Sequence, residues 1–265
     1  MPVFIKPPLR IWMGRHTQSE ENKAWGEAWR GNLGPIRKIR THQGGEIHLT
    51  SSGRAQAAKI GLWLDHWRAK RRKLRFLHYR SASLRVHEMV DIIMPDTVWC
   101  VDDFLRERDT GILGTMLPAE RQIYEENLSE RFTFAELYRL RPGEERGNPT
   151  GESFADVEAR LKRGFIAGIK AACGGKNMFL LGHGGTTWVL RALLEDMQPE
   201  VFLRIYQEKR LKIKNGSILE YTSINPLTGQ HTGIINWMRM CTPWENQEFS
   251  RWTFLKKTRE TLFCE

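Results

Sequence analysis

Residues 9–22 read LRIWMGRHTQSEEN, and the interpretation of the whole chain starts from this stretch. Its apolar run, residues 11–13, predicts a buried strand, and Gly14 leads from that strand into a polar loop. The loop presents a guanidinium, Arg15, beside an imidazole, His16. An arginine–histidine pair at a strand end is weak evidence alone. Whether this pair belongs to a binding site depends on whether later strands bring further anion-binding side chains close to it.

The composition bounds the class of protein. A chain of 265 residues with 40% hydrophobic and 27% charged residues is typical of a globular protein with a substantial core. No window is long and apolar enough for a membrane helix, and the N-terminal residues lack the apolar core of a signal peptide. The four cysteines lie far apart without a CxxC pair, which favours free thiols in a reducing compartment. We therefore expect a cytoplasmic protein with no membrane contact.

The net charge of +10 calls for an anionic partner. The densest basic run is RAKRRKLR, residues 68–75. Cations are favoured near a helix C-terminus, so the simplest interpretation is a solvated helix end that leads into a strand. The run has no interleaved aromatic residues and does not favour a nucleic-acid contact. The charge itself is compatible with nucleic acid, a membrane surface or a small anionic substrate, and a contact surface for another partner stays an alternative for the basic run.

Strand-like and helix-like segments alternate along the chain, which predicts an α/β fold. We expect one three-layer sandwich, residues 1–240, with a mostly parallel central sheet flanked by helices and a helical cover insertion at 118–150. Residues 241–265 carry several aromatic side chains, so this extension should pack on the domain or on a partner. The expected strands are 11–13, 74–79, 98–101 and 177–182, with a hairpin of 218–224 and 232–238. The expected helices are 23–32, one that takes its N-cap from residues 50–53 and runs through 67, one that starts after Arg85 and runs to about 93, 118–131, 153–174, and one that follows residues 183–187 and ends at 194.

Charged and polar side chains follow four of the expected strands. Arg15 and His16 follow the first strand, and Arg85, Glu107 and His183 follow later ones. Loops at the carboxyl ends of strands converge in open α/β sheets, so these side chains should meet. Arginines bind phosphate oxygens, an imidazole can attack phosphorus, and a carboxylic acid can protonate the leaving oxygen. The set is suited to phosphoryl transfer without a metal or other cofactor.

Six segments then resemble, in order, the motifs of the histidine phosphatase superfamily, the phosphoglycerate mutase-like enzymes. Each motif alone is modest evidence, and six in one order are strong. They cover about residues 10–224. The six segments are Arg15-His16-Thr17 with Asn22, residues 49–57 (LTSSGRAQA), 81–85 (SASLR), 106–111 (RERDTG), 151–153 (GES) with Asp156 and Arg160, and 181–185 (LGHGG).

The resemblance implies the catalytic roles. His16 corresponds to the nucleophile that becomes a phosphohistidine, and His183 to its histidine partner. Glu107 corresponds to the proton donor, while Asp109, two residues further on, is an alternative acid. A lone histidine at a strand end is more often structural, so the assignment depends on the motifs taken together.

The resemblance also implies the phosphate pocket. Arg15 and Arg85 belong to it, and Asn22 is a further candidate whose alternative role is helix capping. Glu152 and Ser153 are expected to cap a helix, and Arg160 to form an ion pair at the surface or between domains.

Two positions depart from the family pattern. Thr17 stands where the first motif has glycine, and Met89 where a threonine is common after the second arginine. Thr17 adds a side chain beside the nucleophile, which could narrow the pocket, supply a hydroxyl or weaken catalysis.

We expect a phosphatase that hydrolyses a small phosphomonoester through a phosphohistidine. One alternative is a phosphoglycerate mutase-type transfer, which returns the phosphoryl group to substrate. Another is a catalytically weak family member that serves as a binding or regulatory protein. The sequence leaves the substrate open, and it is compatible with a homo-oligomer.

Overall fold

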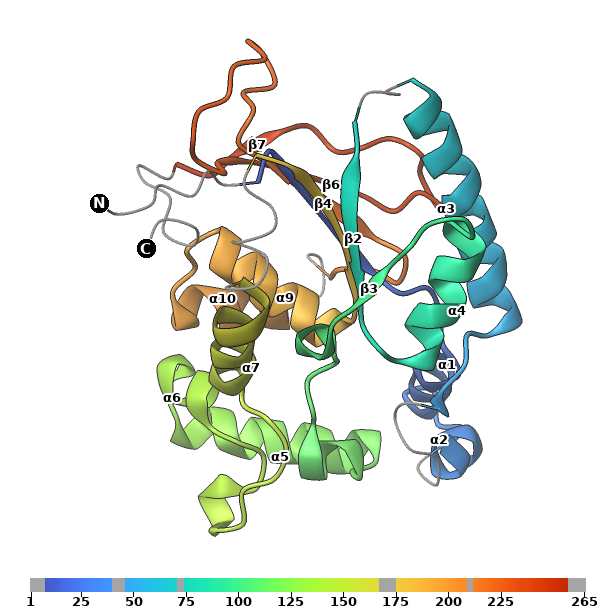
Figure 1. The fold of residues 1–265 in the computed structure, drawn as a ribbon. Helices are drawn as coiled ribbons and strands as arrows, with labels where there is room; N and C mark the ends of the chain where they lie inside the picture. The colour runs from blue at the N-terminus through green and yellow to red at the C-terminus, as the bar shows by residue number, and fades with distance from the viewer. Residues whose placement is uncertain (1–7, 40–45, 71–73, 167–174, 209–211, 257–265) are drawn as a thin grey trace.

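A single mixed sheet forms the centre of the molecule (Figure 1). A computed structural model of the chain describes residues 8–39, 46–70, 74–166, 175–208 and 212–256. The seven strands lie in the order β3-β2-β4-β1-β5-β6-β7. Their bounds are β1 Arg10–Arg15, β2 Phe76–Arg80, β3 Cys100–Val101, β4 Asn177–Gly182, β5 Ile218–Thr222, β6 Trp237–Cys241 and β7 Thr253–Phe254.

The four strands that lead to predicted site residues are parallel. β3, β2, β4 and β1 run in one direction, whereas β5, β6 and β7 are joined to them and to one another in antiparallel pairs. In the register of β1 and β4, Arg15 lies opposite Gly182. His16 and His183 therefore leave the sheet at the same level, from neighbouring strands.

Alternation along β1 divides the core between the two faces of the sheet. Trp12 packs with α3 (Ser51–Ala69) and α4 (Leu84–Ile93) on one face. Ile11 and Met13 pack on the other face with α7 (Phe154–Arg160), α9 (Gly184–Leu194) and α10 (Pro199–Gln207). Figure 1 shows these helices on opposite sides of the sheet. The predicted three-layer α/β sandwich is confirmed.

Further helices lie below the sheet in Figure 1, at the end where β1, β2 and β4 finish. They are α1 (Glu20–Ala28), α2 (Gly34–Ile39), α5 (Pro118–Arg131) and α6 (Phe134–Arg139). The last two belong to the expected cover insertion. No helix of the described ranges has the length and apolar character needed to cross a bilayer.

Several expected boundaries shift for local reasons. The first helix begins at Glu20 because Ser19 and Asn22 form a capping box. β3 contains only Cys100–Val101. The second hairpin strand is Trp237–Cys241 rather than 232–238, because the connection after β5 takes up residues 223–236. After Arg160 the chain continues as a π-helical turn, Leu161–Ile166; the expected end of that helix, at 167–174, lies outside the described residues.

Residues 242–254 contact the sheet and α3. Trp63 donates from its indole to the carbonyl of Gln247 at 2.8 Å, and β7 pairs with β6. The guanidinium of Arg239 lies between two rings of this segment, 4.1 Å from Phe249 and 4.2 Å from Trp252. Cation–π contacts of this kind, together with the strand pairing, fasten the segment to the domain.

Candidate active site

A cavity of about 540 Å³ lies beyond the carboxyl ends of the parallel strands. Arg85, Glu107 and His183 line it. His16 is buried beside it, with its ring centroid 5.2 Å from that of His183. The complete lining is Glu21, Ser81, Ala82, Ser83, Arg85, Asp103, Arg106, Glu107, Arg108, Asp109, Thr110 and His183.

The hydrogen bond of His16 fixes its tautomer. Its Nδ1 lies 2.7 Å from the carbonyl oxygen of Thr17, which can only accept, so Nδ1 carries the proton. The lone pair is therefore on Nε2. Burial, followed by the charges of Arg85 and Arg15, lowers the pKa of His16 well below its usual value. The imidazole stays neutral near pH 7, as a nucleophile must be.

His183 is held by two serines from the loop after β2. Its Nε2 lies 2.8 Å from Ser81 Oγ and 3.1 Å from Ser83 Oγ. Its Nδ1 lies 3.4 Å from Nη2 of Arg85, which can only donate. Burial, then the neighbouring His16 and Arg85, lowers the pKa of His183 well below its usual value. His183 is therefore neutral, with its proton on Nε2.

Two buried guanidiniums flank the histidines. Arg15 donates from Nη1 to the carbonyl of Ile213 at 2.6 Å, while its buried Nε has no acceptor among the described residues. Burial lowers the pKa of Arg15. Arg85 is 5% exposed, and its Nη1 lies 3.4 Å from a carboxylate oxygen of Glu21. Arg15 and Arg85 place two positive charges beside the histidines, where they can bind the oxygens of an anion.

Backbone amides orient Glu107. Its Oε1 accepts from the amide of Arg108 at 2.9 Å and from that of Thr186, in the first turn of α9, at 3.3 Å. A side chain at Gly185 would place its Cβ 2.7 Å from that oxygen, so glycine permits this approach. Because Oε1 accepts two N–H groups, a proton on this carboxyl group is carried by Oε2.

An ionic network that the sequence did not predict holds the segment around Glu107, residues 104–109, in place. Glu152 accepts two bonds from Arg106, at 2.9 and 2.6 Å, and two from Arg160, at 3.0 and 3.1 Å. Arg160 also donates to the carbonyl of Phe104 at 2.6 Å. The expectation of a surface or interdomain ion pair for Arg160 is wrong, because its side chain is 9% exposed and lies within the domain.

Asn22 is held within a hydrogen-bond network. Its Oδ1 accepts from the amide of Ser19 at 3.2 Å, as part of the α1 cap, and from Nδ2 of Asn215 at 2.7 Å. The same Nδ2 lies 3.0 Å from the carbonyl oxygen of His16. Asn22 thus caps a helix as its alternative role requires, and its phosphate contact stays a prediction. Asn215, which the sequence did not single out, ties Asn22 to the nucleophile loop.

The 49–57 motif supports the residues after His16. Thr50 accepts from the amide of Gly53 at 2.9 Å and so caps α3. The Cβ of any other residue at Gly53 would lie 2.0 Å from the carbonyl oxygen of Gln18, so only glycine lets α3 start here. Gln56 Oε1 accepts from the Gln18 amide at 3.0 Å. The motif holds the polypeptide that follows the nucleophile.

The two departures from the family pattern lie outside the cavity lining. Thr17 is fully buried, and its hydroxyl has no hydrogen-bond partner within the described part of the chain. Met89 is 1% exposed in the core between α3 and α4. Asp109, the alternative acid, does line the cavity, and its Oδ1 accepts from the Gly111 amide at 2.9 Å. The effect of the Thr17 side chain on the pocket stays a prediction.

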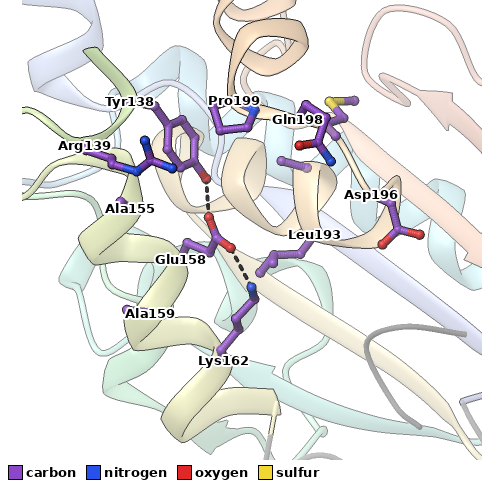
Figure 2. A pocket seen from close by; sticks show the side chains of 12 residues that line it. Tyr138, Arg139, Ala155, Glu158, Ala159, Lys162, Leu193, Asp196, Gln198 and Pro199 are labelled. Atoms are coloured by element: carbon purple, nitrogen blue, oxygen red, sulfur yellow. Dashed lines mark hydrogen bonds and ion pairs between the residues drawn. The ribbon is translucent and has the colours of Figure 1, made fainter. Parts of the chain in front are cut away.

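A second cavity, of about 550 Å³, lies between α6, α7 and the end of α9 (Figure 2). One of its two carboxylates, Glu158, is already bonded to the hydroxyl of Tyr138 at 2.7 Å and to the ammonium of Lys162 at 2.6 Å. None of the predicted site residues lines it. Over the described ranges, no cluster of three histidine, cysteine or acidic side chains is arranged to hold a metal ion.

Solved structures share the fold at low identity. A mycobacterial glucosyl-3-phosphoglycerate phosphatase in complex with inorganic phosphate is 22% identical, with 80% of this chain and 88% of that chain covered and a TM-score of 0.55. Mycobacterial hydrolase 1 is also 22% identical, with coverage of 88% and 95% and a TM-score of 0.56. The Bacillus stearothermophilus protein YhfR is 19% identical, with coverage of 85% and 97% and a TM-score of 0.56.

A search of curated proteins gave no match. The sequence model described as "Histidine phosphatase superfamily (branch 1)" matches residues 11–223, which contain the sheet strands β1 to β5 and every predicted site residue. The chain therefore belongs to the histidine phosphatase superfamily, as its six motifs predicted.

Proposed function

We propose that this protein is a phosphatase that hydrolyses a small phosphomonoester through a phosphohistidine on His16. The observation that carries the proposal is the neutral His16, whose Nδ1 proton is bound to the Thr17 carbonyl at 2.7 Å. Its Nε2 is thereby left with a lone pair in a buried site between two arginines. The family membership and the phosphate-bound fold relative support a phosphoryl-transfer reaction.

In the first step, Nε2 of His16 attacks phosphorus and the bond from phosphorus to the leaving oxygen breaks. Arg15 and Arg85 hold the phosphate oxygens, where their charge stabilises the transition state. Glu107 donates its proton from Oε2 to the leaving oxygen, so the alcohol departs neutral. A bound phosphate dianion favours protonation of His183, whose Nδ1 can then donate to an equatorial oxygen.

In the second step, water attacks the phosphohistidine. The Glu107 carboxylate takes a proton from the water, the bond between nitrogen and phosphorus breaks, and inorganic phosphate leaves. His16 returns to its neutral form and Glu107 to its acid form. Atoms and charge balance over the two steps.

The lining of the cavity favours a polar leaving group. Ala82 supplies its one apolar side chain, and carboxylates, hydroxyls, guanidiniums and the imidazole of His183 supply the rest. Such groups form hydrogen bonds with the hydroxyls of a leaving group. We therefore expect phosphate esters of small hydroxylated alcohols to be better substrates than aryl or long-chain phosphates.

A panel of phosphomonoesters tests the reaction class. Each ester is incubated with and without bisphosphoglycerate, and free phosphate and acid-labile phosphoprotein are followed. Release of phosphate that His16→Ala abolishes supports the proposal. Isomerisation without release supports the mutase, and the absence of both turnover and phosphoenzyme with every ester supports the weak-member alternative.

A pair of variants tests the acid. Glu107→Gln should slow alkyl esters by at least tenfold more than nitrophenyl phosphate, whose leaving group needs little protonation. Asp109→Asn makes the same change two residues away and should slow both substrates equally, if at all. The reverse pattern would assign the acid to Asp109.

A further inference from the structure

A third cavity, of about 620 Å³, opens between the C-terminal half of α3 and the sheet. It shares no lining residue with the active-site cavity. Trp12 and Phe179 contribute to it from the middle of β1 and β4, well before the strand ends that carry His16 and His183. This cavity is therefore separate from the active-site cavity, and the proposed phosphatase reaction does not use it.

Aromatic rings form the inner part of this cavity. The Trp12 ring centroid lies 4.4 Å from that of Trp67, 5.1 Å from that of Phe76 and 5.6 Å from that of Phe179. His78 adds a further ring, 6.3 Å from Phe179. Rings gathered at these distances offer both faces and edges to a planar ligand.

Trp12, one of the lining residues, has a buried hydrogen-bond donor without an acceptor in the described part of the chain. Trp12 is 1% exposed, and its indole N–H has no hydrogen-bond partner among the described residues. Buried polar groups are nearly always paired, so the unpaired N–H of this lining residue is available to an atom of a bound molecule. An oxygen or nitrogen acceptor on a bound molecule would satisfy it.

Positive charge lies at the rim. Arg68 and Arg75 both line the cavity, and within the part of the chain that the structure describes neither side chain pairs with a carboxylate. Asp65 is the single acidic residue of the lining. Burial, followed by the charge of Arg68, lowers the pKa of His78 to about 4, so this ring is neutral near pH 7. The net charge of the lining is positive.

We propose that this cavity binds a small planar aromatic molecule that carries an anionic group. The ring would pack against the aromatic side chains of the lining, with an acceptor atom toward the indole N–H of Trp12. The anionic group would pair with Arg68 and Arg75, as charge-assisted bonds to guanidiniums favour. This assigns a task to two residues of the basic run 68–75.

Anilinonaphthalene sulfonate, an aromatic anion, is a suitable probe for the full-length protein. We expect one saturable site per chain by calorimetry, with enhanced dye fluorescence. The double variant Arg68→Ala/Arg75→Ala should weaken binding at least tenfold. Ala69→Trp places a large ring in the cavity without removing a charge and should abolish binding. Circular dichroism and the urea midpoint show that each variant is folded.

Two controls separate this site from the others. Arg139→Ala removes an arginine from the cavity of Figure 2 and should leave dye affinity unchanged. Inorganic phosphate competes for the active site and should not displace the dye. Displacement by phosphate, or equal affinity of the wild type, the double variant and Ala69→Trp, would overturn the proposal. Neither result depends on whether the protein has phosphatase activity.

Discussion

The two walls of the active site are fixed by different kinds of bond. The inner wall is the nucleophile loop, residues 15–17, which lies beside the cavity lining and is held by the loop 213–217. The amide of Gly216 donates to the carbonyls of Arg15 and His16, both at 3.1 Å, and Asn215 donates to the carbonyl of His16. The outer wall, residues 103–110, is held by the ionic network of Arg106, Glu152 and Arg160.

The difference follows from what each wall must do. His16 attacks as a neutral imidazole, and a carboxylate close to it would raise its pKa. Uncharged backbone and amide bonds fix its position without that effect. Glu107 lies on a segment that leaves the sheet after β3, where no strand pairing holds it. Two charged side chains, Glu152 just before α7 and Arg160 at its last residue, hold that segment instead.

The largest effect is expected on the outer wall. Glu152→Gln leaves Arg106 and the buried Arg160 without their carboxylate. Breaking a largely buried pair costs about 3 kcal/mol in the free energy of unfolding. Urea denaturation measures this loss, and the rate with alkyl phosphate esters should fall with it, because Glu107 loses its support.

Glu125→Gln is the matched control for this variant. It makes the same change in the exposed pair of Arg121 and Glu125, whose carboxylate side chain is 51% exposed. An exposed pair of this kind contributes less than about 0.5 kcal/mol. If the two variants lost equal stability, the outer wall would not depend on its ionic network.

The next effect concerns the inner wall. Asn215→Ala removes the donor shared by the carbonyl of His16 and the side chain of Asn22, which should cost about 1–3 kcal/mol of stability and lower kcat. Asn215→Asp places a carboxylate at the same point. It should raise the pKa of His16, so the acid limb of the kcat/KM profile moves to higher pH.

The pH profile separates these two variants. In the wild type, the lowered pKa of His16 keeps the imidazole neutral, so kcat/KM should hold as the pH falls through 6.5, its ordinary value. Nitrophenyl phosphate is a suitable substrate because its phosphate remains dianionic over this range. An acid limb that stays in place in Asn215→Asp would show that Asn215 acts through position alone.

The sequence predicted those parts of the fold that local patterns encode. Apolar runs predicted β1 and β4, an N-cap within residues 50–53 marked the start of α3, and Ser153 marked the start of α7. Placement at the strand ends brought His16 and His183 together as expected. Each of these signals depends on residues within one turn or one strand.

Hydrogen bonds between residues far apart in the sequence could not be predicted from local patterns. Asn215 and His16 are 199 positions apart, and Arg160 lies 54 positions from the carbonyl of Arg106 that it also approaches. An asparagine in a loop and an arginine on a helix have many ordinary uses, so their local sequence does not mark them. The same holds for Ser81, whose bond to His183 emerges only when β2 and β4 pair.

A smaller effect on stability and kcat is expected at Trp244, which lies after the residues that match the family model and contacts the loop that holds the inner wall. Trp244 donates from its indole to the carbonyl of Asn215 at 2.7 Å and packs on Gly216. Trp244→Phe keeps the ring and removes the donor, which should cost about 1 kcal/mol of stability. We expect kcat to fall less than in Asn215→Ala, with KM unchanged. Trp252→Phe, in the same segment but packed on Arg239, should leave kcat unchanged.

The smallest effect is expected at Thr17, the position where the family motif has glycine. Its hydroxyl is buried without a partner among the described residues, and its side chain does not line the cavity. Thr17→Val keeps the shape and removes the unpaired hydroxyl, so stability should stay the same or rise by about 1 kcal/mol. Activity should remain within twofold of the wild type. A large loss of kcat in this variant would instead show that the hydroxyl takes part in the reaction, and the inner wall would then do more than position His16.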